Sequence, residues 1–183
     1  FNLYLILIKQ KKFKEALMLV DEVLIIKKNY QPALRDKGLI FLNLKKPNEG
    51  FRYITDSLKQ NPQDYIALNT LGMIYLELKK TEEAEKIFKK IIETNPQYIS
   101  TYNNLGRCYS IQYKRDEALK YYKIVLDKDP NHLDALNNIA NHYSETGYYE
   151  KALGYYFKAL ELDKNNNELF FNIGCAYAYL KEY

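Results

Sequence analysis

The sequence predicts an all-α protein, a solenoid of stacked antiparallel helix pairs with about five repeats plus one further helix, and two observations support this prediction. The first is a fixed period of 34 residues. In residues 99–132 the marks of the period are Leu105, Gly106, Tyr109, Ala118, Tyr122 and Pro130. The same places 34 residues earlier hold Leu71, Gly72, Tyr75, Ala84, Phe88 and Pro96, and 34 residues later they hold Ile139, Ala140, Tyr143, Ala152, Tyr156 and Lys164. A period of this length is typical of solenoids, in which stacked neighbours bury the apolar stripe that one helix pair cannot bury alone.

The second observation is that each period contains two helical faces. The first face has spacings of three, one and three residues, at Tyr102, Leu105, Gly106 and Tyr109. The second has spacings of four and three, at Ala118, Tyr122 and Val125. We expect the small residues Gly106 and Ala118 to let the two helices approach closely. Glycine returns at this first-helix place as Gly38, Gly72 and Gly174. Because glycine inside a helix costs about 0.5–1 kcal/mol relative to alanine, its return indicates a packing requirement.

Charged residues and prolines mark the boundaries of these helices. Residues 113–116 form a short polar turn, and Asp116 and Glu117 then place negative charge in the first turn of the second helix, where the helix dipole favours it. Pro130 ends that helix, because proline disfavours helical geometry in the residue before it. We expect Pro130 to lie in the first turn of the next helix.

These marks together make the chain resemble the tetratricopeptide repeat (TPR) family. The pattern is L-G-x-x-Y, then A-x-x-x-[FY], then a closing proline, and it covers all 183 residues without an insertion. The resemblance implies a right-handed superhelix of antiparallel helix pairs. In such a superhelix the first helix of each repeat (helix A) lines a concave groove, and the second (helix B) forms the outer layer.

In chain order, we interpret residues 1–183 as a single TPR solenoid segment. Its repeats are 1–30 (partial), 31–64, 65–98, 99–132, 133–166 and 167–183 (partial, one helix A). Both ends cut through a repeat, and the opening residues are too apolar for a terminal cap. We therefore expect a window from a longer solenoid.

The repeat 31–64 departs most from the pattern. Lys37 stands where leucine is expected and Gly50 where alanine is expected, while Pro47 opens helix B at a tolerated position. We expect this repeat to be the loosest packed. Its Lys37 side chain should pack along its stem, with the ammonium group reaching water.

Composition narrows the classes of partner. The net charge of +4, from 27 basic and 23 acidic residues, is too mild to indicate binding to nucleic acid or an anionic membrane. No apolar run reaches the roughly 18–20 residues that a membrane helix needs. Cys108 and Cys175 lie two repeats apart, too far for a disulfide, so two unpaired thiols favour a reducing, intracellular (cytoplasmic) location.

Motifs for catalysis are missing from the sequence. The two histidines, His132 and His142, lie near no cysteine, so zinc spacing is absent. Neither a glycine-rich phosphate loop nor a nucleophile elbow occurs. We therefore expect no enzyme activity, catalytic residue, metal, cofactor or small-molecule substrate.

The TPR resemblance directs attention to helix A. It implies that the residue before the L-G pair faces the groove, and these residues are Asn2, Asp36, Thr70, Asn104, Asn138 and Asn172. The last three form an asparagine ladder, similar to the repeats of O-linked N-acetylglucosamine transferases. A carboxamide carries one acceptor and two donors, so successive rungs can hold an extended peptide backbone. The alternative is that water or a neighbouring helix satisfies these amides.

Further groove positions complete the candidate site. The predicted peptide-binding residues are Asn104, Asn138, Asn172, Asn69, Asn103, Asn137, Arg107 and Asn141. Arg107 is the one evident anchor for a carboxylate or phosphate. The lysines of a carboxylate clamp are missing from the matching helix A positions.

Basic residues also follow the turns between helices A and B. They are Lys11, Lys12, Lys45, Lys46, Lys79, Lys80, Lys114 and Arg115. Either they keep the edge of the solenoid soluble or they meet an acidic partner.

The leading functional hypothesis is a non-enzymatic scaffold that binds a protein partner, as an extended peptide or a helix, in the groove of the A helices. One alternative is a structural solenoid segment packed within a large multiprotein assembly. Another is a set of substrate-recruiting repeats of a longer enzyme. RNA binding, by analogy with pentatricopeptide helix pairs, is the least favoured because the charge is modest.

Overall fold

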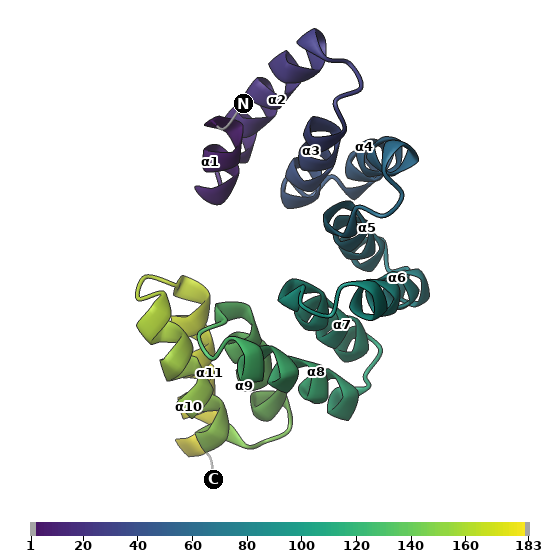
Figure 1. The fold of residues 1–183 in the computed structure, drawn as a ribbon. Helices are drawn as coiled ribbons and strands as arrows, with labels where there is room; N and C mark the ends of the chain where they lie inside the picture. Colours follow the sequence, from purple (N-terminus) through teal and green to yellow (C-terminus); the bar gives the residue numbers. More distant parts are fainter. Residues whose placement is uncertain (1–2, 182–183) are drawn as a thin grey trace. The chain divides into compact units, whose positions relative to one another are not determined.

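The computed structural model describes residues 3–181, and within them it contains eleven α-helices and no strand (Figure 1). Their bounds are α1 (Leu3–Lys9), α2 (Phe13–Ile26), α3 (Gln31–Asn43), α4 (Pro47–Gln60), α5 (Tyr65–Glu77), α6 (Thr81–Thr94), α7 (Ile99–Ile111), α8 (Arg115–Lys128), α9 (Leu133–Glu145), α10 (Tyr149–Leu162) and α11 (Asn167–Lys181). Sequential helices pack as antiparallel pairs. The predicted all-α solenoid of about five repeats plus one helix is confirmed.

Odd-numbered helices are the A helices and even-numbered helices are the B helices. From α2 to α10 the lengths repeat strictly, with 13 residues in each helix A and 14 in each helix B. This constancy keeps residues 34 apart in equivalent places, because every repeat advances the chain by the same number of turns.

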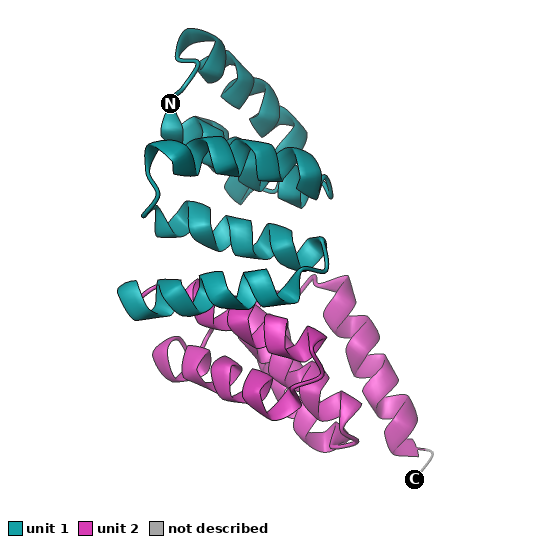
Figure 2. Cartoon of the chain, turned by 90° about the vertical axis from the view of Figure 1, so that its right-hand side faces the viewer, with its two compact units in different colours: residues 1–95 teal, residues 96–183 magenta. Residues whose placement is uncertain are grey.

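The chain divides into two compact units (Figure 2). Unit 1 covers residues 1–95 and holds α1 to α6, and unit 2 covers residues 96–183 and holds α7 to α11. Within unit 1, α3 contacts α5, and within unit 2, α9 contacts both α7 and α11. The A helices therefore form a layer of their own in each unit.

The core of each unit is built from the period marks. In unit 1, Ala84, Phe88 and Ile91 of α6 are fully buried, and in unit 2 the corresponding Ala152 and Tyr156 of α10 are buried as well. One apolar cluster of unit 2 joins α9, α10 and α11, and one of unit 1 joins α3, α4 and α5. Burial of these side chains against the next helix provides most of the favourable free energy of folding.

Glycine sets the distance between helices A and B. A Cβ atom added at Gly72 would lie 2.4 Å from Cε1 of Phe88, and one added at Gly106 would lie 2.5 Å from Cε1 of Tyr122. The predicted packing requirement is thus confirmed at Gly72 and Gly106, since the aromatic ring of helix B occupies the space of a methyl group on helix A. At Gly174 the prediction was wrong, because no atom lies within 4 Å of a Cβ there.

The divergent repeat 31–64 is not loosely packed, and our expectation was wrong. Gly38 of α3 faces Gly50 of α4, and a Cβ at Gly50 would lie 2.9 Å from the Gly38 carbonyl oxygen. With glycine on both sides the two backbones come close together. Ile54, which is fully buried, fills the place that the aromatic ring takes elsewhere.

Lys37 also differs from expectation, because its ammonium group does not simply reach water. Its Nζ lies 2.6 Å from Oδ1 of Asp21 in α2 and 4.1 Å from the centre of the Tyr53 ring in α4. Lys37 stands at a position where the repeat pattern predicts leucine. An ion pair and a cation–π contact accommodate it instead.

Every turn from helix A to helix B has the same backbone. Lys11, Lys45, Lys79 and Tyr113 have φ of 59 to 60°, and Gly147 has φ 80°. In the third of these turns, the Lys79 N–H donates to the Leu76 carbonyl at 3.0 Å and the Lys80 N–H donates to the Tyr75 carbonyl at 2.8 Å. This is a Schellman motif with a left-handed residue that glycine would suit best, and lysine occupies it in three turns.

The turns from helix B to the next helix A correct the expected place of proline. Pro130 lies in the turn between α8 and α9, not in the first turn of α9, which begins at Leu133. Asp129 shapes this turn, as its Oδ1 accepts from the Asn131 N–H at 3.2 Å and its carbonyl accepts from the His132 N–H at 3.1 Å. Pro47, by contrast, opens α4 as predicted.

The close approach at Gly106 leads to a first prediction. Replacing Gly106 with Ala forces the Tyr122 ring to move, and we expect the free energy of unfolding to fall by about 1–3 kcal/mol. Gly174 in α11 is the matched control, because no atom lies within 4 Å of a Cβ there. Gly174→Ala should raise stability by about 0.5–1 kcal/mol through helix propensity alone. Urea denaturation compares the two variants, and equal effects would contradict the packing account.

The left-handed turn residues lead to a second prediction. Replacing Lys79 with Gly relieves the strain of φ +60° and should raise the free energy of unfolding by about 0.5–1 kcal/mol. The neighbouring Lys80 has φ −95°, so Lys80→Gly relieves no strain and should stabilise nothing. Thermal unfolding of the two variants measures the difference, and a gain at Lys80 alone would refute it.

Candidate functional site

The candidate site consists mainly of asparagines on the A helices of unit 2. Seven of the eight predicted residues lie there, with Asn103, Asn104 and Arg107 in α7, Asn137, Asn138 and Asn141 in α9, and Asn172 in α11. We call these seven residues the polar face of unit 2. Asn69 lies in α5 of unit 1, where its Nδ2 lies 3.8 Å from the Met73 sulfur.

Amides of the polar face link one A helix to the next. Nδ2 of Asn138 donates to Oδ1 of Asn103 at 3.0 Å, and Nδ2 of Asn172 lies 3.4 Å from Oδ1 of Asn141. Each bond joins a ladder position to a different position of the preceding helix A. Each also fixes the orientation of the two carboxamides that it joins.

Exposure separates the rungs of the predicted ladder. Asn103 and Asn104 are only 5% and 6% exposed, whereas Asn138 and Asn172 are half-buried. Arg107, Asn137 and Asn141 are half-buried too, and Oδ1 of Asn137 is buried without a hydrogen-bond partner in the described chain. Asn138 and Asn172 are therefore more accessible than Asn104.

Tyrosine hydroxyls lie beneath the polar face, at two of the period marks of the B helices. Tyr156 in α10 donates to Oδ1 of Asn141 at 2.6 Å, so that oxygen is held from below. Tyr156 also bonds to the Ser144 hydroxyl, and Tyr122 in α8 bonds in the same way to Ser110. Burial raises the pKa of Tyr156 to about 12 and raises that of Tyr122 as well, so both remain protonated donors.

The same places in unit 1 are apolar. Where unit 2 has Ser110 with Tyr122, the repeat before it has Leu76 with Phe88. Serine and tyrosine change together between repeats, because a buried tyrosine hydroxyl needs a partner that leucine does not offer. Comparing repeats position by position would have revealed this signal in the sequence.

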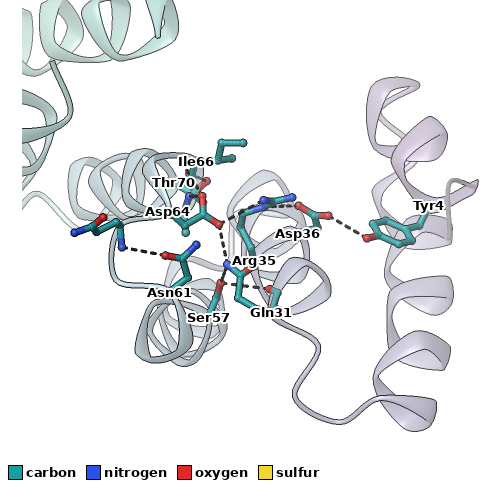
Figure 3. A network of polar contacts seen from close by, with 11 residues as sticks. Tyr4, Gln31, Arg35, Asp36, Ser57, Asn61, Asp64, Ile66 and Thr70 are labelled. Atoms are coloured by element: carbon teal, nitrogen blue, oxygen red, sulfur yellow. Dashed lines mark hydrogen bonds and ion pairs between the residues drawn. The ribbon is translucent and has the colours of Figure 1, made fainter. Parts of the chain in front are cut away.

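In unit 1, the ladder position of α3 holds Asp36, which belongs to an ionic network (Figure 3). Asp36 is 5% exposed, accepts from the Tyr4 hydroxyl at 3.1 Å, and pairs with Nε of Arg35 at 2.9 Å. The Thr70 hydroxyl donates to the Ile66 carbonyl of its own helix at 3.0 Å. Asn2 lies outside the described residues.

The network continues from Arg35 to the start of α5. Arg35 Nη1 lies 3.4 Å from Oδ2 of Asp64, which also accepts from Nε2 of Gln31 at 2.7 Å. The other oxygen of Asp64 caps α5 by accepting from the Ile66 and Ala67 N–H groups at 3.0 and 3.2 Å. One carboxylate therefore joins α3 to α5.

Burial and charge act against each other in this network. Partial burial by itself would raise the pKa of Asp64, but the hydrogen bonds from Gln31, Ala67 and Ile66 and the charge of Arg35 outweigh it and hold that pKa below its usual value. Burial, together with the nearby Asp36 charge, raises the pKa of Tyr4 to about 12. The Asp64 carboxylate therefore stays ionised and the Tyr4 phenol stays a donor at neutral pH.

Residues 3–181 contain neither a metal-binding cluster nor a membrane-spanning helix. No group of three or more His, Cys, Asp or Glu in this range has the arrangement to hold a metal ion. None of the helices described is both long and apolar enough to cross a membrane. Cys108 is buried and Cys175 half-buried, and neither forms a disulfide bond, as their spacing predicted.

Repeated helix pairs of constant length, with polar A helices and apolar contacts between A and B, define an α-solenoid repeat protein. Comparison with known families makes this specific. The family model described as "Psidin, N-terminal TPR repeats region" matches residues 2–113, and two models described as tetratricopeptide repeat match residues 99–128 and 135–170. The chain belongs to the tetratricopeptide repeat family, whose members typically mediate protein binding.

Solved structures share the fold. TTC0263, a thermophilic TPR protein in Thermus thermophilus, is 21% identical with a TM-score of 0.87, covering 97% of this chain and 96% of its own. A tetratricopeptide repeat protein from Parabacteroides merdae is 17% identical with a TM-score of 0.87, covering 96% and 69%. YrrB, a TPR protein with an unusual peptide-binding site, is 21% identical with a TM-score of 0.61, covering 98% and 89%. A search of curated proteins found no match.

The lowered pKa of Asp64 leads to a third prediction. A carboxylate with a folded-state pKa below its unfolded value stabilises the fold above the unfolded pKa, and this contribution disappears as the pH falls through the folded pKa. Asp64→Asn keeps an oxygen to cap α5 but loses the charge. At pH 7 the variant should unfold at a lower temperature than the wild type, and the difference should shrink towards pH 3. A difference independent of pH in thermal unfolding would contradict the role of the charge.

Proposed function

We propose that the protein is a non-enzymatic scaffold that binds a segment of a partner protein on the polar face of unit 2. The observation that carries the proposal is the fixed orientation of the carboxamides. Asn138 donates one of its two N–H groups to Asn103. Its remaining N–H group and its oxygen are available to the backbone of an incoming peptide. Because the inter-helix bonds order these side chains in advance, binding loses less side-chain entropy.

The regular repetition of these amides matches the regular repetition of N–H and C=O groups along the main chain of a bound peptide. Peptide N–H and C=O groups recur along any extended segment, and amide side chains on successive A helices offer both kinds of partner without reading the sequence. YrrB, a TPR protein of the same fold, has an unusual peptide-binding site, which supports peptide binding as the kind of function. Cys108 and Cys175 form no disulfide bond, which supports a reducing, intracellular setting for the scaffold.

The small free energy of each hydrogen bond limits the affinity that the amides provide alone. Each net hydrogen bond contributes about 0.5–1.5 kcal/mol, so three rungs give only weak binding. A tighter partner needs further contacts, and Arg107 supplies one for a carboxylate on the partner. The protein therefore binds its partner through many weak contacts spread over several repeats.

A fourth prediction tests this site. Peptides are selected from a random display library with the whole chain as bait, and the affinity of one selected peptide is measured by fluorescence anisotropy. Asn138→Ala and Asn172→Ala should each weaken binding about two- to tenfold, the loss of one net hydrogen bond. Lys120→Ala, an exposed residue of helix B in α8, is the control and should leave the affinity unchanged.

Circular dichroism must show that the asparagine variants stay folded, because their amides also join A helices. Wild-type affinity in both folded variants would place the binding site elsewhere. Packing within an assembly through the exposed apolar residues Ile25, Ile26 and Phe171 would then be the better explanation.

A further inference from the structure

A small polar cleft opens within unit 2 beside the polar face. Its volume is about 80 Å³, and three helices line it. Helix α7 contributes Ser110, α8 contributes Arg115, Ala118 and Tyr122, and α9 contributes Asn138, Asn141, His142 and Glu145. Two of these residues, Asn138 and Asn141, belong to the proposed peptide-binding site, so a bound segment would pass directly over the cleft.

Hydrogen-bonding groups surround this cleft on all sides. Ala118 is the one apolar side chain among its lining residues. The hydroxyls of Ser110 and Tyr122 bond to each other, and Tyr122 is only 3% exposed. An apolar side chain in such a cleft would displace water from these groups without replacing its hydrogen bonds, and each group left unpaired costs about 1–3 kcal/mol.

The charges that line the cleft balance. Nε of Arg115 lies 3.8 Å from Oε2 of Glu145, so one positive and one negative charge face each other at the rim. Burial lowers the pKa of His142 although the charges of Asp116 and Glu145 oppose it, so the imidazole is neutral at pH 7. Without a net charge the cleft favours neither a carboxylate nor an ammonium group.

One serine–tyrosine pair, Ser110 with Tyr122, lines the cleft. The equivalent positions in unit 1 hold Leu76 with Phe88 and Leu42 with Ile54, which have no hydroxyl group. The chain thus carries two versions of the same helix contact, one apolar and one polar. Only the polar version offers hydrogen-bonding groups between the A helix and the B helix.

We propose that this cleft is a side-chain subsite that takes the carboxamide of an asparagine or glutamine in the bound peptide. A primary amide is neutral and has both donors and an acceptor, which matches the mixed lining of Glu145 oxygens, hydroxyls and the Asn138 amide. A volume of about 80 Å³ corresponds to two or three water molecules at roughly 30 Å³ each, enough for an amide head group. The proposal rests on the peptide-binding function proposed above and adds a sequence preference to it.

The test uses the chain's own apolar version of the contact. The double variant Ser110→Leu/Tyr122→Phe copies the Leu76–Phe88 pair, so the helix contact is conserved while the hydroxyls and the cleft are lost. Random nonapeptides are selected by phage display against the whole wild-type chain and against the double variant. Circular dichroism and thermal unfolding check that the double variant folds as the wild type does.

We expect peptides selected by the wild type to be enriched in asparagine or glutamine at one position. Replacing that residue by alanine in a synthetic peptide should weaken wild-type binding about five- to tenfold, and binding to the double variant less than twofold. Leu76→Ser/Phe88→Tyr in unit 1 is the reciprocal control and should not alter the preference.

The outcomes separate the two proposals. Selected peptides without an amide preference, or an amide preference that persists in the folded double variant, would overturn the subsite and leave the peptide-binding function standing. Failure to select any peptide with the wild type would overturn both.

Discussion

The contact on which the rest of the structure depends is the one between a glycine of helix A and a large side chain of helix B. At Gly72 and Gly106 an aromatic ring lies where a methyl group would be. This brings the two axes close together and leaves the ring fully surrounded, which a packed interior requires. In residues 31–64 the same place brings Gly38 against Ile54, and in residues 133–166 it holds Ala140 instead of glycine. The A helices present equivalent positions because the helix lengths repeat.

The chemistry of that contact then decides the character of each unit. A phenylalanine or isoleucine ends in carbon, so this contact between helices A and B is apolar in unit 1. The tyrosine hydroxyls of unit 2 reach helix A. The Tyr122 hydroxyl bonds to Ser110, and the Tyr156 hydroxyl bonds to Ser144 and donates to Oδ1 of Asn141. One oxygen atom on the ring thus turns a packing position into part of a polar surface.

The period made the fold predictable, and it made the site only partly so. Helix pairs, buried glycines and the place of each asparagine follow from residues that return every 34 positions. The bonds of Asn138 to Asn103 and of Asn172 to Asn141 do not, because they join different positions of successive repeats. They depend on how one helix A crosses the next, which no single repeat encodes. The ion pair of Lys37 could not be predicted for the same reason, because its partner Asp21 belongs to the previous repeat.

The ladder position shows how one place serves two purposes. In α3 it holds Asp36, whose charge is committed to Arg35 and Tyr4, and breaking a buried ion pair of this kind is strongly unfavourable. In α9 and α11 it holds asparagine, whose neutral amide spends one hydrogen bond on a neighbour and retains others. A carboxylate there stabilises the stack but excludes an uncharged peptide. An amide contributes less to the stack, and for that reason we propose it as the group that binds a partner.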